Sequence, residues 1–525
     1  MILSFLVLFL ASCTNLDEKL KGDITEDIQI PGLGTGGGGG SGDVLGGAFA
    51  GLRNIGTANH SNVYSIQEIT SDEMCIGAKG GDWFDGGILV ELHRHTYTPT
   101  HAFITGTWNN LYSAINTTNE LLKGGTLDAN QTAQVRALRA YYYMKLMDFY
   151  GNVKIITQPG VDAPQATREQ VFSFVESELL AALGVSAVGP GMNLANSPLG
   201  AGTDKNRINV YGALGIISQL YLNAETYVGT KMYDKAAAAA GYVIDSGAYS
   251  LCGDGCKVPN LGRRPSVTSD PENLEGYAAV FAPNNESNPE NIFTVYYDEA
   301  KAGGMNFAMM SLHYSSQFTW NFTAQPWNGY ATLEEFYNSY ENGDVRKKNN
   351  FIVGPQLDFG GSAILDYAAD DSDLQLNYTP AINELTPNCK REAGARPGKF
   401  SYKQLGRPDM DNDYPIVRLG DLYLIRGEAK ARQSGNWNDA LADVNVIRRR
   451  AKVSEYTTLN AAEFLKERGR EMYQEGIRRT DLIRFGRYND AWWEKPASQP
   501  FRNLFPIPQD AINASGGTLK QNPGY

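Results

Sequence analysis

The sequence predicts a mainly α-helical protein, in which a scaffold of tetratricopeptide-like helical hairpins carries one long loop-rich excursion. Long stretches from Trp108 to about residue 250, and again from residue 416 onward, repeat apolar residues at spacings of three and four. Residues 251–415 instead combine Gly, Pro, Asn and aromatic residues with short apolar runs. Because binding residues tend to lie on loops that a rigid scaffold holds, we expect the excursion to form the binding face.

The chain begins with a short apolar segment, residues 2–11. Ten residues are too few to cross a bilayer, which takes roughly 20, but they suit the core of a secretory signal. The following "LASC" resembles the lipobox of bacterial lipoproteins, in which the cysteine becomes the lipidated first residue. We therefore expect a signal peptide over residues 1–12 and a lipid on Cys13, which would hold the protein on a membrane.

An acidic and glycine-rich tether is expected over residues 13–43, because "PGLGTGGGGGSGD" has the composition of a flexible linker. Its glycines formally fit GxGxxG, but no βαβ pattern surrounds them, so we expect no nucleotide site. The body of the protein then spans residues 44–525. We divide it into a helical part, 44–250, the excursion, 251–415, and a second helical part, 416–525.

Three pairs of segments predict the hairpins of the scaffold. "VYGALGIISQLYLNAETY" (210–227) has one apolar face and precedes "MYDKAAAAAGYVIDSG" (232–247), for which Gly247 is the expected C-cap. Small residues at Ala224 and Ala236 would let these two helices approach closely. The other pairs are residues 135–151 with 167–183, and the two halves of residues 419–451.

Composition and charge exclude some functions. A net charge of −12 argues against nucleic acid as a partner, since phosphate binding needs a basic surface. Without Cys13, four cysteines remain, and "CGDGC" could close a Cys252–Cys256 bridge. "HRHTYTPTH" offers histidines to a metal, but satisfied histidines are the more common case, and we expect neither a metal nor a cofactor.

Three glutamates of the C-terminal part repeat at a spacing of four: Glu467, Glu471 and Glu475. A like-charge stripe of this kind destabilises an isolated helix, so basic side chains must face it. Arg478, Arg479 and the run 448–450 are the expected partners, in a structural and not a catalytic role.

The same segment resembles the SusD/RagB family of outer-membrane nutrient-binding lipoproteins. The family's ER…E…EG.R..DL.R pattern is matched by Glu467-Arg468, Glu471, Glu475-Gly476, Arg478, Asp481-Leu482 and Arg484. "YPIVRLGDLYLIRGEAKA" and the closing "FPIPQDAINASGGTLKQNPGY" are similar to further family motifs, as are "GGDWFDGG" and "LRAYYYMKLMDFYGNV". The resemblance covers roughly residues 14–525.

The resemblance implies a lipoprotein on the outer face of the outer membrane that acts as the lid of a SusC-like TonB-dependent transporter. It implies capture of an oligosaccharide with no covalent chemistry. Asp17 and Glu18 resemble the surface-export signal of these lipoproteins. Two alternatives stay open: a peptide-binding lid of the RagB type, and a surface glycoside hydrolase, because two catalytic carboxylates need only be close in space.

Two loop stretches supply the chemistry that a sugar receptor needs. Sugar rings present flat C–H faces bordered by hydroxyl groups, so a receptor combines exposed aromatic platforms with amides and carboxylates. "GGDWFDGG" offers Asp82 and Trp83 between glycine pairs, and "TWNFTAQPWNGY" offers further aromatic and amide groups. The expected ligand-binding residues are Asp82, Trp83, Trp320, Trp327, Asn328 and Tyr330.

Overall fold

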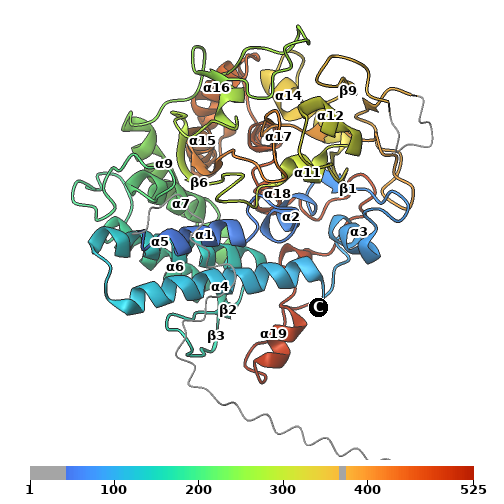
Figure 1. Ribbon diagram of the computed structural model, residues 1–525. Helices are drawn as coiled ribbons and strands as arrows, with labels where there is room; N and C mark the ends of the chain where they lie inside the picture. Colours follow the sequence, from blue (N-terminus) through green and yellow to red (C-terminus); the bar gives the residue numbers. More distant parts are fainter. Residues whose placement is uncertain (1–42, 366–373) are drawn as a thin grey trace, which may run out of the picture. The chain divides into compact units, whose positions relative to one another are not determined.

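The computed structural model describes residues 43–365 and 374–525, and α-helices dominate its regular structure (Figure 1). The predicted signal peptide, Cys13 and the tether up to residue 42 lie outside these described residues. Among the helices that are described, none combines the length and apolar character needed to cross a membrane. The predicted mainly α-helical class is confirmed.

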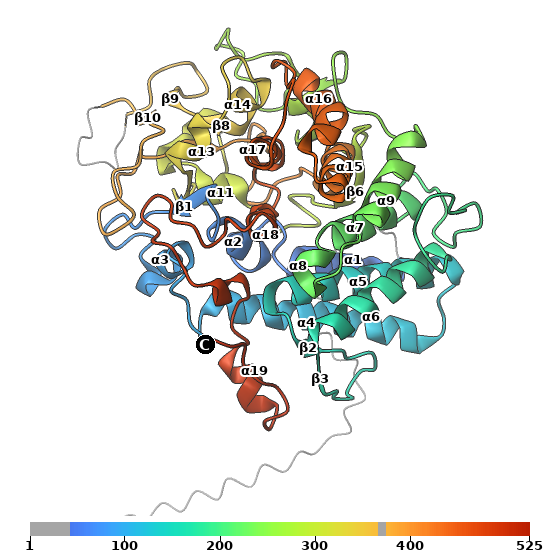
Figure 2. The same cartoon turned by 180° about the vertical axis from the view of Figure 1, so that it is seen from behind.

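The longer helices form the scaffold. They are α1 (Gly46–Asn54), α4 (Ala102–Gly124), α5 (Ala129–Tyr150), α6 (Arg168–Leu183), α7 (Val210–Leu222), α9 (Tyr233–Asp245), α15 (Leu419–Ser434), α16 (Leu441–Arg450) and α17 (Ala461–Met472). Neighbours in space follow the order α4, α5, α6, α7, α9, α15, α16, each packing on the next (Figure 2). The three predicted hairpins are therefore present, and α15 packs on α9 although residues 246–418 separate them in sequence.

Local signals in the sequence explain where these helices begin. Asp128 caps α5 by accepting a hydrogen bond from the Gln131 backbone at 2.8 Å, while the Gln131 side chain accepts one from the Asp128 backbone at 3.0 Å. Thr167 and Gln170 form the same capping box at the start of α6. Such caps satisfy backbone donors that a helix start leaves without partners.

Shorter elements fill the rest of the body. The short helices are α2 (Val63–Glu68), α3 (Ile88–His93), α8 (Ala224–Val228), α10 (Tyr277–Val280), α11 (Phe307–Ser311), α12 (Gln317–Trp320), α13 (Glu334–Asn338), α14 (Val345–Asn350), α18 (Arg478–Arg484) and α19 (Gln509–Ala514). The 3-10 turns are η1 (Asp85–Gly87), η2 (Tyr314–Ser316), η3 (Trp437–Ala440) and η4 (Pro500–Asn503).

The strands are short and form antiparallel pairs. The pairs are β1 (Met74–Ile76) with β7 (Tyr330–Thr332), β2 (Val153–Lys154) with β3 (Gln165–Ala166), β4 (Lys257–Pro259) with β5 (Asn273–Glu275), β6 (Asn291–Val295) with β12 (Tyr414–Arg418), β8 (Phe351–Ile352) with β11 (Arg396–Pro397), and β9 (Gly354–Pro355) with β10 (Asn377–Tyr378). Most lie in the loop-rich excursion. The Cys252–Cys256 bridge, which the sequence left open, forms at its start, with the two Cα atoms 5.3 Å apart.

Two predicted helices end early. The segment 210–227 breaks at Asn223 into α7 and α8, and Ser246, not Gly247, caps α9. The segment around the glutamate stripe also breaks, because the backbone turns at Tyr473 (φ −43°, ψ 136°) before α18 begins. Glu475 therefore lies in the turn between α17 and α18, where its carboxylate accepts hydrogen bonds from Arg418 and Lys399.

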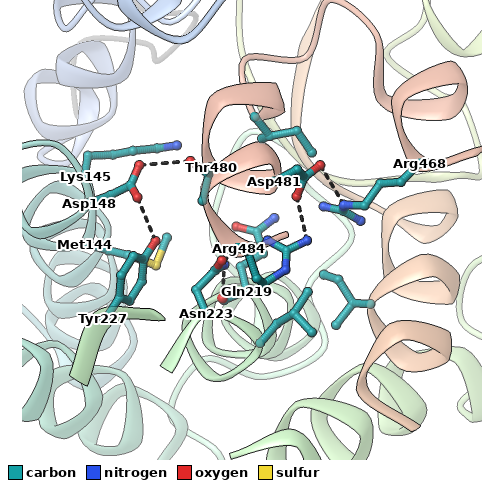
Figure 3. Close-up of a pocket in the computed structure, with 13 residues that line it drawn as sticks. Met144, Lys145, Asp148, Gln219, Asn223, Tyr227, Arg468, Thr480, Asp481 and Arg484 are labelled. Carbon is teal, nitrogen blue, oxygen red and sulfur yellow. Dashed lines mark hydrogen bonds and ion pairs between the residues drawn. The ribbon is translucent and has the colours of Figure 1, made fainter. Parts of the chain in front are cut away.

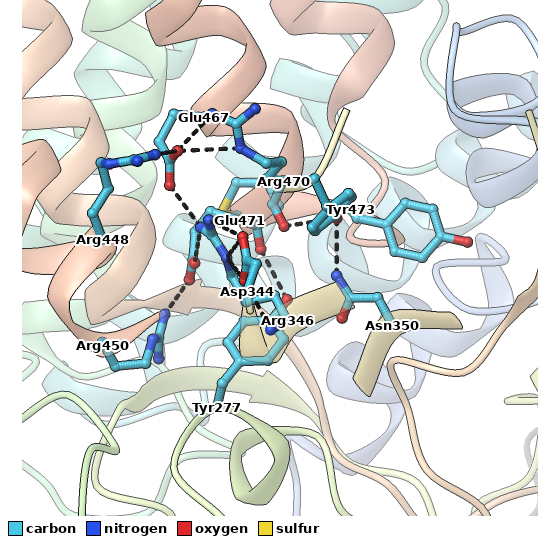
Figure 4. A network of polar contacts seen from close by, with 12 residues as sticks. Tyr277, Asp344, Arg346, Asn350, Arg448, Arg450, Glu467, Arg470, Glu471 and Tyr473 are labelled. Carbon is cyan, nitrogen blue, oxygen red and sulfur yellow. Dashed lines mark hydrogen bonds and ion pairs between the residues drawn. The ribbon is translucent and has the colours of Figure 1, made fainter. Parts of the chain in front are cut away.

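A buried network of ion pairs surrounds α17 (Figure 4). The side chains of Glu467 and Glu471 are 0% exposed. Arg346 reaches both carboxylates, at 2.8 Å and 3.1 Å. Arg418, from β12, lies 2.7 Å from Glu471, and Arg450, from α16, forms a further ion pair with the same glutamate. Three separate segments, α14, β12 and α16, are thus tied to one helix.

The partners of the stripe were only partly predicted. Arg448 contacts Glu467 at 2.7 Å, and Arg450 contacts Glu471, as expected. Arg478 and Arg479, however, pair with Asp72 at 2.7 Å and Asp148 at 3.3 Å. Their α18 turns away from the stripe, and the remaining charge is met by residues that the sequence did not indicate: Arg346, Arg418 and Lys399.

Electrostatics keeps these carboxylates charged. Burial alone would raise the pKa of Glu467, but Arg346, Arg470 and Arg448 outweigh it and lower the pKa to about 2. A similar cluster surrounds Glu428, where burial is again outweighed, by Arg484 first, and the pKa falls to about 2. Both glutamates are therefore anions at neutral pH, and each depends on its arginines.

A second polar cluster connects α18 to α5 and α8 around a cavity of about 40 Å³ (Figure 3). Asp148 accepts hydrogen bonds from Tyr227 at 3.1 Å and from Thr480 at 2.9 Å. Arg484 lies 2.7 Å from Asp481 and donates to the Asn223 side chain at 2.8 Å. Asn223, where α7 ends, is thus held by the same cluster.

Replacing Arg418 tests the network. Arg418→Met should lower the free energy of unfolding by about 3–5 kcal/mol, because it leaves buried carboxylates without a partner. The matched control is Lys466→Met, which removes an exposed ion pair with Glu463 and should cost less than about 1 kcal/mol. Urea denaturation of both variants measures the difference. Equal losses would show that the buried pairs contribute no more than surface ones.

Candidate functional site

The stretch "GGDWFDGG" forms a tight loop between β1 and α3 (Figure 1). Lys79 and Asp82 pair through their backbones, with Lys79 N–H donating to the Asp82 carbonyl at 2.8 Å. Trp83 and Asp85 have positive φ values of 59° and 42°, and Gly80, Gly86 and Gly87 have positive φ values as well. These left-handed residues turn the backbone sharply, and glycine adopts such a φ without strain.

The second aromatic stretch runs along α11. The backbone N–H of Trp327 donates to Met309 at 2.7 Å, and that of Gly329 donates to Met310 at 2.9 Å. Asn328 between them has φ 60°. These bonds fix the direction in which the Trp327 side chain leaves the backbone.

Trp83 and Trp327, which lie 244 residues apart in sequence, meet at the surface. The indole N–H of Trp83 donates to the carbonyl oxygen of Trp327. The ring of His60 lies edge-on to both, with ring centroids 6.3 Å from Trp83 and 5.4 Å from Trp327. A Cβ on Gly329 would come within 2.6 Å of the Trp83 ring, so only glycine leaves room for it.

Polar groups border these rings. Asp82 is exposed and accepts a hydrogen bond from the hydroxyl of Tyr314. Partial burial raises the pKa of Asp82, and the nearby charge of Lys79 opposes that rise. Burial also lowers the pKa of His60, so its ring is uncharged near neutral pH. We call the set of His60, Asp82, Trp83, Tyr314 and Trp327 the aromatic face.

The rings of the face differ in exposure. Trp327 is 36% exposed, Trp83 is half-buried, and Phe84 beside it is exposed. Apolar rings that are held in place can stack against a flat apolar surface, and a carboxylate and a hydroxyl near them can bond to polar groups of the same ligand. The arrangement suits binding of a ligand with both features.

Three of the six predicted residues therefore lie together: Asp82, Trp83 and Trp327. Asn328 is 0% exposed, and its side-chain oxygen accepts from Arg396 at 2.8 Å. Tyr330 is also 0% exposed, and its hydroxyl lies 2.6 Å from the Ser65 hydroxyl. The structure gives both residues interior contacts and no access to a ligand, so we leave them out of the proposed site.

Trp320 is not part of the aromatic face. Its ring stacks on Phe322, with centroids 5.6 Å apart, and meets Tyr402 edge-on at 5.2 Å. It lines a separate cavity beside α12. Conversely, His60 and Tyr314 belong to the aromatic face without having been predicted, because single residues in unrelated segments give no sequence signal.

The histidines proposed as possible ligands are each engaged separately. The Nε2 atoms of His93, His95 and His101 lie 2.8–2.9 Å from the backbone carbonyls of Trp493, Thr70 and Ile88. Within residues 43–365 and 374–525, there is no group of three or more His, Cys, Asp or Glu side chains that could hold a metal ion.

Comparisons with known proteins give a consistent result. Residues 269–525 match the model of the SusD family. The starch-binding protein SusD of Bacteroides thetaiotaomicron is 25% identical, covering 89% of this chain and 86% of its own. A SusD-like protein of Bacteroides ovatus is 23% identical, covering 73% and 66%.

Solved structures agree on the fold. A SusD superfamily protein from Parabacteroides distasonis superposes with a TM-score of 0.68 at 19% identity, covering 91% of this chain and 98% of that one. Surface glycan-binding protein A from Bacteroides thetaiotaomicron, in complex with laminarihexaose, gives 0.65 at 20% identity with the same coverage. Family model, relatives and fold agree, and together they support a SusD-like protein.

Proposed function

We propose that this SusD-like protein captures oligosaccharides at the aromatic face and does not alter them covalently. One observation carries the proposal: the fold brings Trp83 and Trp327 together at the surface, and Asp82, next to Trp83 in the chain, bonds to the Tyr314 hydroxyl. The relatives support it, since one is a starch-binding protein and one was solved with laminarihexaose.

The chemistry of the face fits a sugar ring. The apolar C–H face of a pyranose can pack on an indole ring, and the ring hydroxyls can donate to the Asp82 carboxylate. Because the Trp83 N–H bonds to Trp327 and Gly329 packs under Trp83, the platforms are already in place before a ligand arrives. A preformed site of this kind spends little free energy on ordering its own side chains.

A role without catalysis rests on the relatives, which are described as binding proteins. Incubation of the protein with the bound glycan should release no reducing ends. Appearance of such ends would favour the glycoside hydrolase alternative.

Replacing the two tryptophans tests the face. Trp83→Ala or Trp327→Ala should weaken glycan binding by about 2 kcal/mol, the scale of a buried aromatic hot spot. Isothermal titration calorimetry with starch- and laminarin-derived oligosaccharides measures the loss. The control is Trp493→Ala, which removes a partly exposed tryptophan that contacts His93 outside the face.

Thermal unfolding of the same variants separates binding from folding. The midpoints of the Trp327 variant and the wild type should nearly coincide. Unchanged affinity in both tryptophan variants, or loss of affinity only together with a collapsed midpoint, would remove these residues from the site.

We further propose that a lipid on Cys13 anchors the protein to the outer membrane and exposes it at the cell surface. Cys13→Ala should move the protein from the membrane fraction to the soluble fraction, because no other anchor is indicated by the sequence. Leu33→Ala, a change in the tether that keeps the cysteine, should stay in the membrane fraction. Retention of Cys13→Ala in washed membranes that lack the transporter would refute the anchor.

The partner that we propose is a SusC-like TonB-dependent transporter, for which the protein would act as the lid. The expectation rests on the family resemblance of the helical motifs. Affinity purification of the wild-type protein from native membranes should recover a large transporter barrel in near-equal amount. Repeated recovery of the protein alone would contradict a stable lid.

A further inference from the structure

A second cavity, of about 840 Å³, is lined by residues of α12, α14 and β9. Figure 1 labels these three elements. Its volume is in the range of sites that hold small organic ligands. The Thr319 hydroxyl donates to the Leu357 carbonyl at 3.0 Å, which ties α12 to the segment that follows β9. None of the five residues of the aromatic face lines it.

Three aromatic side chains line this cavity, Trp320, Tyr337 and Phe351, and each is held in place by a neighbouring ring. Trp320 is half-buried and rests against Phe322 and Tyr402. Tyr337, on α13, meets Phe351 edge-on with ring centroids 5.1 Å apart. The cavity therefore offers apolar ring surface from three segments of its wall, α12, α13 and β8.

The charged side chains that line the cavity differ in whether they already have a partner of opposite charge. Each lining carboxylate already has an arginine: Asp270 lies 2.8 Å from Arg264, Glu341 lies 2.7 Å from Arg448, and Asp344 lies 2.8 Å from Arg346. The two lysines of α14 have no such partner: within the described residues, neither Lys347 nor Lys348 forms an ion pair with a carboxylate.

Lys347 has an unusual environment. Its ammonium group lies over the ring of Tyr337, 4.2 Å from the centroid. A cation on an aromatic face keeps its charge and loses part of its water shell, so an incoming anion meets it at a lower desolvation cost. Lys348, one position along, is exposed at the same wall.

We infer that this cavity binds a sugar unit that carries an anionic group, a carboxylate or a sulfate. The ring of the sugar would lie against Trp320 or Tyr337, and its anionic group would pair with Lys347 and Lys348. This second site goes beyond the proposed capture of oligosaccharides at the aromatic face, because its recognition is by charge and its residues are different.

The test compares two anionic probes, one a carboxylate and one a sulfate, with a neutral sugar. Calorimetry would use tetragalacturonate for the carboxylate, a sulfated carrageenan oligosaccharide for the sulfate and maltotetraose as the neutral sugar. At least one anionic probe should bind the wild type. Lys347→Met/Lys348→Met should weaken that binding roughly tenfold or more, since a charge-assisted contact is lost.

Control variants separate charge from folding. Lys347→Arg/Lys348→Arg keeps both charges and should retain binding, and Lys123→Met/Lys520→Met removes two exposed lysines elsewhere and should have no effect. Trp320→Ala should weaken binding of the anionic probe. Binding of a neutral glycan by the lysine variants should be unchanged, and binding of the anionic probe should survive Trp83→Ala.

Two outcomes overturn the inference: neither anionic probe binds the wild type, or binding persists equally in Lys347→Met/Lys348→Met. A protein that binds the anionic probe but no neutral glycan would contradict the proposed function of the aromatic face and leave this second site standing. Failure of one proposal is thus distinguishable from failure of the other.

Discussion

Pairing of the buried glutamates of α17 with arginines is the constraint on which the remaining structure depends. A carboxylate such as Glu471 can be buried only where guanidinium groups replace the water that it loses. Those groups come from Arg346 on α14, Arg418 on β12 and Arg450 on α16, so the requirement fixes three distant segments against one helix. Close packing adds to this: a Cβ on Gly215 would come within 2.2 Å of Val417, which places α7 directly on β12. The helical array and the loop-rich excursion are in this way joined through β12.

The aromatic face is positioned by the same interior. β1 pairs with β7, so the loop that contains Trp83 begins beside the strand that follows Trp327. Asn328, just before β7, bonds to Arg396, and Tyr330, at the start of β7, bonds to Ser65. These two contacts hold the strand in place. Residues that looked like ligands in the sequence thus support the platform from beneath. The face is therefore rigid because its neighbours in sequence are buried.

The spacing of apolar residues was enough to predict where the helices lie. An apolar residue every three or four positions forms one face of a helix, and that face packs against neighbouring helices. The spacing was not enough to predict the ends of the helices: Asn223 and Tyr473 interrupt helices for tertiary reasons that no local pattern records. For the same reason, only part of the candidate site could be predicted from the sequence. Trp83 was recognisable from its flanking glycines, whereas the contact with His60 and the separation of Trp320 depend on how segments hundreds of residues apart come together. Residue type alone could not separate the exposed Trp327 from the buried Asn328 beside it.

The most direct test of this account is a crystal structure of the protein with an oligosaccharide that it binds. The account predicts a sugar ring in van der Waals contact with the indole rings of Trp83 and Trp327, a ring hydroxyl bonded to Asp82, and little movement of the α11 and β7 backbone. A glycan bound elsewhere, with those two rings free, would contradict it.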